Sequence, residues 1–152
     1  MLKYILFSIE LSRQYAHGLM ADIADDQLTA QPVPGQMINH PAWVLTHLCV
    51  SNDFGTTLLG GKGICPPDWS QRYGMGAKPL PERSAYPGKA ELLKVLDDST
   101  QQFVAQLKVA TPEQLTKPMP ENLRNFFPTV GDFVVFDFTS HWGTHLGQLS
   151  TW

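Results

Sequence analysis

Apolar side chains recur with the period of an α-helix in four stretches of this sequence, at residues 2–23, 40–58, 89–107 and 129–152. Within each stretch the apolar positions fall on one stripe, which is typical of a helix that buries a single face. The segments between the stretches hold most of the proline and glycine, the residues that interrupt helices. No segment predicts a convincing β-strand. The pattern therefore predicts an all-α fold.

Two of these stretches carry sequence signals for a first helical turn. In the second stretch Asn39 or His40 can cap the helix, and Pro41 suits its first position, where a missing N–H costs nothing. In the last stretch Thr129 is followed three residues later by Asp132, an acidic variant of the capping box. Both signals support helices that begin at these residues.

A long connection, residues 60–88, separates the second and third stretches and is too rich in proline and glycine for a regular element. Loops of this length in compact domains are usually functional lids or crossovers. Between the third and fourth stretches, TPEQL at 111–115 predicts one or two helical turns, and residues 117–128 are expected to be irregular. We expect a four-helix bundle, and the helix pattern alone does not choose between a crossover and an up-down topology.

Composition narrows the function without identifying it. The 152 residues suit a single domain, 1–152, with 43% hydrophobic and 16% charged residues. The formal charge of -3, without a cluster of Lys or Arg, argues against nucleic acid as a partner. No run of about 18 apolar residues predicts a membrane span, and no leader pattern opens the chain, so we expect a cytoplasmic protein. Cys49 and Cys65 are expected to be reduced thiols rather than metal ligands.

The histidines carry the candidate chemistry. His141 and His145 in SHWGTHLGQLS are one turn apart and project from the same helical face, a spacing that can chelate one metal ion. Both lie in a stripe of Val, Phe, Leu and Trp, where a polar group needs a specific partner. His47 falls on the inner face of the second stretch. The alternative is that the three histidines are buried, form hydrogen bonds within the protein and bind no metal.

The role of two neighbouring polar residues remains open. Asp137, four residues before His141, can orient that imidazole, bind metal directly, or be a solvated helix residue. Gln148, one turn after His145, has the same ambiguity. We leave His40 and His17 out of the site, because His40 is expected at a helix cap or on the surface and His17 on a helix flank.

The stretch PVPGQMINHPAWVLTHLCVSNDF, followed much later by SHWGTHLGQLSTW, resembles the DinB-like (DNA-damage-inducible) superfamily. Comparable segments DDQLTAQPVPG, AELLKVLDD and TPEQL extend the resemblance over essentially the whole chain. The resemblance implies a four-helix bundle with a crossover-type connection between helices 2 and 3, often assembled as a homodimer. It also implies one divalent metal ion held by His47, His141 and His145.

The activities known in this superfamily use a metal to handle thiols, as in bacillithiol transferases, mycothiol-dependent isomerases and the metal domain of sulfoxide synthases. The resemblance thus implies a divalent-metal-dependent S-transferase that joins a low-molecular-weight thiol to an electrophilic small molecule. Two alternatives stay open, namely a non-catalytic metal-binding or dimerisation module and a metal-dependent hydrolase. The resemblance does not choose among zinc, nickel, manganese and iron, and it does not imply DNA binding.

Overall fold

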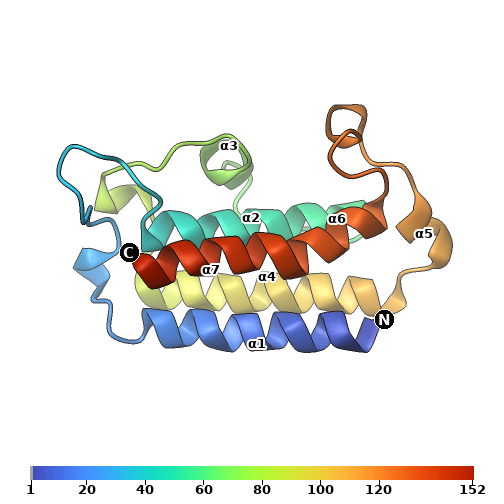
Figure 1. The fold of residues 1–152 in the computed structure, drawn as a ribbon, viewed down its shortest axis with the longest axis horizontal. Helices are drawn as coiled ribbons and strands as arrows, with labels where there is room; N and C mark the ends of the chain where they lie inside the picture. The colour runs from blue at the N-terminus through green and yellow to red at the C-terminus, as the bar shows by residue number, and fades with distance from the viewer. Residues whose placement is uncertain (1) are drawn as a thin grey trace.

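The long helices of the protein lie side by side along one axis (Figure 1). The computed structural model describes residues 2–152, in which the long elements are α1 (Leu2–Met20), α2 (Pro41–Leu58), α4 (Lys89–Val109) and a continuous run of α6 (Val130–Phe136), η4 (Asp137–His141) and α7 (Trp142–Thr151). The shorter elements are α3 (Trp69–Tyr73), α5 (Pro112–Thr116), η1 (Asp25–Gln27), η2 (Arg83–Ala85) and η3 (Glu121–Leu123). Within residues 2–152 no β-strand forms, so the all-α prediction is confirmed, although the helical elements outnumber the four that periodicity predicts.

Helix starts follow the predicted capping signals, whereas the end of the first helix does not follow the apolar stripe. His40 caps α2 by accepting from the backbone N–H of Trp43, and Thr129 and Asp132 form the predicted capping box of α6. The prediction that the first helix reaches Ile23 is wrong. The backbone N–H of Ile23 bonds three residues back, to the carbonyl of Met20, so the chain tightens into a turn after α1 ends.

Helix α2 forms the centre of the packing, since every residue from 41 to 49 is buried. It packs tightly against α4 at Gly55, where an added Cβ would lie 2.1 Å from Cζ of the buried Phe103 ring. The inward positions predicted for α4 are all buried, namely Leu92, Leu96, Ser99, Phe103 and Leu107. Periodicity thus identified the core face of this helix correctly.

Helices α1 and α7 run in one direction along the bundle, and α2 and α4 run in the other (Figure 1). The connection from residue 59 to residue 88 therefore returns along the length of the bundle before α4 begins. In the part of the chain that the structure describes, no helix is long and apolar enough to cross a membrane. Cys49 and Cys65 are free thiols, as predicted.

This long connection is not irregular throughout, which corrects the prediction from its proline and glycine content. It contains α3, which lies beside α2 in Figure 1, and the short turn η2. Aromatic packing holds α3 in place, because the fully buried Tyr73 stacks on Tyr86 with ring centroids 5.2 Å apart and donates a hydrogen bond from its hydroxyl to the carbonyl of Ala85. The connection thereby brings the end of α3 against α2.

Candidate metal centre

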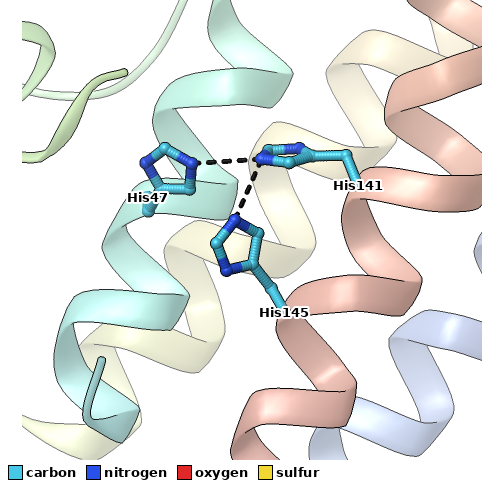
Figure 2. Close-up of side chains that lie close together, drawn as sticks. All are labelled: His47, His141 and His145. Atoms are coloured by element: carbon cyan, nitrogen blue, oxygen red, sulfur yellow. Dashed lines mark hydrogen bonds between the residues drawn. The ribbon is translucent and has the colours of Figure 1, made fainter. Parts of the chain in front are cut away.

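His47, His141 and His145 converge on one point between α2 and the last helical run (Figure 2). Nε2 of His141 lies 3.1 Å from Nε2 of His47 and 3.1 Å from Nε2 of His145. The candidate ligand atoms of the group all lie within 4.8 Å of one another. The structure thus brings together the three histidines that the sequence predicts for the site.

A π-helical segment carries two of the polar groups of this site. In η4 the backbone N–H of Trp142 bonds to the carbonyl of Asp137, five residues back, instead of four. Asp137 begins this segment and His141 ends it, while His145 lies in the first turn of α7. Single π-turns inside α-helices are frequently found at functional sites. The spacing of apolar residues does not predict the extra residue in this turn.

Each of the three imidazoles forms a hydrogen bond through its Nδ1 to an oxygen atom of the protein. His47 Nδ1 lies 2.6 Å from the carbonyl oxygen of Tyr73, and His141 Nδ1 lies 2.8 Å from Oδ1 of Asp137. His145 Nδ1 lies 2.9 Å from Oε1 of Gln148. Carbonyl, carboxylate and amide oxygens only accept hydrogen bonds, so each Nδ1 carries the proton and donates. Each Nε2 therefore presents a lone pair.

Among residues 2–152 no donor reaches these three lone pairs, and a cation between them would relieve the repulsion of acceptors in contact. Imidazole nitrogens bind zinc at about 2.0–2.1 Å, so one ion can contact nitrogens with the observed separation. The outer partner on every Nδ1 is the usual arrangement around metal-bound histidines. The residues therefore fit one divalent metal ion with a set of three nitrogen ligands.

Burial keeps the histidines in the form that binds metal. Burial and, to a lesser extent, the neighbouring His47 and His141 together lower the pKa of His145 to about 3. Burial also lowers the pKa of His47, against the opposing effect of the Tyr73 carbonyl. Metal ligation requires neutral imidazole. These two side chains are thus neutral at physiological pH without any protein group having to remove a proton.

Aromatic rings enclose the histidines on two sides. The indole of Trp43 stacks on the ring of His47, with centroids 4.6 Å apart and planes 9° apart. The ring of Phe136 stacks on His141 with centroids 5.6 Å apart. These contacts restrict the rotation of two imidazoles and limit the access of water to the site.

A second layer of hydrogen bonds resolves the interpretations left open for two polar residues. Asp137 is fully buried and its Oδ1 accepts from both His141 and the hydroxyl of Ser51, so the solvated interpretation is wrong. Gln148 accepts at Oε1 from His145 and from the side-chain amide of Asn39, at 3.0 Å. Both residues orient an imidazole, and neither belongs to the converging ligand group.

His40 and His17 lie outside the cluster, as expected. His40 is completely buried. Its Nδ1 accepts a hydrogen bond from the backbone N–H of Trp43, and its Nε2 donates one to the carbonyl of Leu80. His40 is therefore the cap of α2 and not a surface residue. Nε2 of His17 lies 2.9 Å from Oδ1 of Asp97 on α4. Neither side chain takes part in the metal centre.

A pocket of about 190 Å³ opens beside the outer partners of His145. Its walls combine the end of α7 with the segment that precedes α2, and the lining residues are Ile38, Asn39, Gln148, Thr151 and Trp152. The amide groups of Asn39 and Gln148 therefore connect the pocket wall with the imidazole of His145.

Comparison with known families gives one match. The family model of the DinB superfamily matches residues 8–149, which include α2, the long connection and the three histidines. A comparison with curated proteins finds no match.

Proposed function

The chain belongs to the DinB superfamily, and from this membership and its converging histidines we propose a protein that binds one divalent metal ion and acts on a small-molecule thiol. The ligands in this proposal are His47, His141 and His145. The observation that carries it is the set of three Nε2 lone pairs, each fixed by a donor bond at Nδ1. We also propose that the long helices form a single bundle, and that residues 59–88 are a crossover connection between α2 and α4.

Three protein ligands leave coordination positions for an exogenous group. A divalent ion bound there lowers the pKa of a thiol and favours the reactive thiolate. The chain supplies the surroundings, since Asp137, Gln148 and the Tyr73 carbonyl orient the imidazoles. The pocket beside Gln148 offers space for part of a small substrate. We propose S-transfer as the reaction: the thiol loses its proton to solvent, and its sulfur forms a bond to the electrophilic carbon of a small molecule as the bond from that carbon to its leaving group breaks.

A non-catalytic metal-binding role is the competing proposal, and one observation favours it. Asp137 is a carboxylate bonded to a candidate ligand, and both His141 and Ser51 already donate to its Oδ1 in a buried environment. Hydrolysis and isomerisation commonly need a positioned acid or base. Thiolate transfer needs less, because the metal can stabilise the nucleophile itself.

The test begins with elemental analysis of protein purified without an affinity tag. Protein loaded separately with zinc, nickel, manganese or iron is then mixed with a panel of low-molecular-weight thiols and a chromogenic electrophile. We expect one bound ion per chain and metal-dependent consumption of electrophile, both lost in His47→Ala and retained in the control His17→Ala. Stoichiometric metal without any thiol-dependent spectral change or turnover would favour the non-catalytic role.

We also propose that the protein pairs with a second copy through the outer face of α1, which lies at the lower edge of the bundle in Figure 1. This face exposes Tyr4 by 65%, Phe7 by 69%, Leu11 by 56% and Tyr15 by 49%. In an antiparallel pair related by a two-fold axis, Tyr4 meets Tyr15 and Phe7 meets Leu11 of the second copy. The four side chains offer on the order of 500 Å² of surface, a large part of the roughly 800 Å² per partner in a stable interface.

Sedimentation analysis at several concentrations tests this pairing. We expect a dimer for the native chain and a monomer for Phe7→Glu combined with Leu11→Glu, since charge on both positions cannot be buried without partners. Phe126→Glu is the matched control, because Phe126 is 75% exposed and belongs to the segment between α5 and α6 and not to α1. A monomeric native chain over the whole concentration range would contradict the proposal.

A further inference from the structure

A second pocket, of about 400 Å³, lies towards the far end of α2 from the start of the helix. It is formed by the last turns of α2 and by the segment from residue 117 to residue 130. Its nearest α2 wall residue, Phe54, follows His47 by about two helical turns, or roughly 10 Å along the axis. Small-molecule sites usually enclose about 300–1,000 Å³. The pocket is thus large enough for a ligand and separate from the histidines.

The lining combines apolar surface with positive charge and contains no acidic residue. Phe54, Leu58, Met119 and Val130 supply apolar walls, together with two prolines, and the cations are Lys117 and Arg124. This combination stands out in a chain whose formal net charge is -3. A site of this composition fits a ligand with an apolar body and a negative charge.

Both cations are free to meet such a ligand. Within residues 2–152 neither Lys117 nor Arg124 pairs with a carboxylate, whereas the other arginines, Arg13, Arg72 and Arg83, all do. Arg124 donates from Nε and Nη2 to the carbonyl of Met119, at 3.2 and 3.1 Å. This anchoring positions the guanidinium and leaves the donors of Nη1 for a planar anion, for which arginine is well suited.

Backbone hydrogen bonds hold the wall opposite α2 in place. The N–H of Val130 donates to the carbonyl of Lys117 at 2.9 Å, and the N–H of Met119 donates to the carbonyl of Pro128 at 3.2 Å. The segment between these residues is therefore closed into a loop at its base. A preformed wall lowers the entropy cost of binding.

We propose that this pocket binds an organic carboxylate with a short apolar chain. The carboxylate contacts Lys117 and Arg124, and the chain packs against the partly exposed Phe54 and Leu58. Binding here does not depend on the metal centre, and the inference stands whether or not the chain is a thiol transferase.

The test is calorimetric titration with octanoate, and with octanol and octylamine as uncharged and cationic analogues. We expect saturable binding of one octanoate per chain and at least tenfold weaker binding of both analogues. Lys117→Gln and Arg124→Gln are each expected to weaken octanoate binding by about tenfold, since each removes one charge-assisted hydrogen bond. The matched control is Lys78→Gln, another exposed lysine without an ion-pair partner within residues 2–152, which should leave the affinity unchanged.

Carboxylates also bind metals, so the titration is repeated with His47→Ala and with chelator-treated protein. Unchanged octanoate affinity in both supports the separate pocket, and loss of binding in both assigns the carboxylate to the metal centre and overturns the proposal. Equal affinities for octanoate and octanol, or no saturable binding, also overturn it. Lys117→Glu guards against misfolding of the Arg124 variant, because within residues 2–152 the exposed Lys117 side chain forms no hydrogen bond or ion pair. This reversal should abolish binding at an unchanged melting temperature.

Discussion

Asp137 Oδ1 lies 2.8 Å from Nδ1 of His141, across one turn of the π-helical segment, and no part of this aspartate is exposed to solvent. A buried carboxylate on the outer nitrogen fixes the tautomer of the ring and makes its other nitrogen more basic. The only other side chain that donates to this oxygen is Ser51, among residues 2–152. The carboxylate of Asp137 thus connects one candidate ligand on its own helical run with Ser51 on α2.

We predict that Asp137→Asn weakens metal binding by about 10- to 100-fold, the usual effect of losing such an outer partner. The amide keeps the shape of the carboxylate but removes its charge. Competition with a chromogenic zinc chelator measures the affinity. Ser51→Ala is the control, since it removes the other donor and retains the charge, and its affinity should stay near that of the native chain. Equal affinities in Asp137→Asn and the native protein would contradict the role of Asp137.

Metal removal should lower stability without unfolding the chain. The core between α2 and α4 consists mainly of apolar side chains, so we expect chelated protein to keep its far-UV circular dichroism. Zinc at about 100 times its dissociation constant adds roughly 2.7 kcal/mol to the free energy of unfolding, which corresponds to about 5–10 °C in melting temperature for a domain of this size. Calorimetry should show this rise in the native chain and not in His47→Ala. Collapse of helical signal on chelation would indicate that the fold itself requires the metal.

His40 predicts a pH dependence of stability that is separate from the metal centre. Burial lowers its pKa in the folded protein, and its Nδ1 must stay unprotonated to accept from Trp43. The unfolded chain therefore binds more protons than the folded one below about pH 6.5, so the contribution of His40 is present above that pH and is lost as the pH falls through it.

The measurement compares urea unfolding of the native chain and His40→Asn between pH 7.5 and 5. Asparagine also caps helices, but it loses the bond to Leu80, so we expect the variant to be about 1–3 kcal/mol less stable at pH 7.5. The difference should narrow towards pH 5. Since the other histidines are the same in both proteins, a constant difference would show that His40 does not titrate in this range.

Two glycines should respond to alanine in opposite directions. Gly55→Ala would place a methyl group 2.1 Å from the buried ring of Phe103, so we predict a loss of about 1–3 kcal/mol from overpacking between α2 and α4. At Gly147 in α7 an added Cβ meets nothing within 4 Å. Gly147→Ala should therefore stabilise the protein by about 0.5–1 kcal/mol through helix propensity. Chemical denaturation measures both, and similar effects of the two changes would disprove the close contact at Gly55.

The long helices and the pair of histidines on the last helical run could be predicted from the sequence, because both depend on local periodicity. The buried positions of α4 and the caps at His40 and Thr129 follow from side chains spaced along one element. His141 and His145 were predictable for the same reason. Their meeting with His47 was predicted from the shared inward faces and from the family resemblance, and the structure brings these three side chains together.

Other features were not predictable, because they depend on contacts between elements. The π-turn of η4 changes the hydrogen bonding without changing the type of residue, so the spacing of apolar side chains does not reveal it. Helix α3 is a single short element, and it is held in place because Tyr73 stacks on Tyr86, a residue from another part of the same connection. The fully buried state of Asp137 also follows only when α2 brings Ser51 against it.

The partner of His47 is a main-chain carbonyl at the end of α3, an acceptor that any residue at position 73 would offer. The bond to His47 therefore depends on the path of the backbone, and the side chain of Tyr73 acts on it only through its packing against Tyr86. The next residue is Gly74, where a Cβ would lie 2.2 Å from the carbonyl oxygen of Ser70. A side chain at position 74 should thus displace the carbonyl that holds His47, although Gly74 itself contributes no ligand atom.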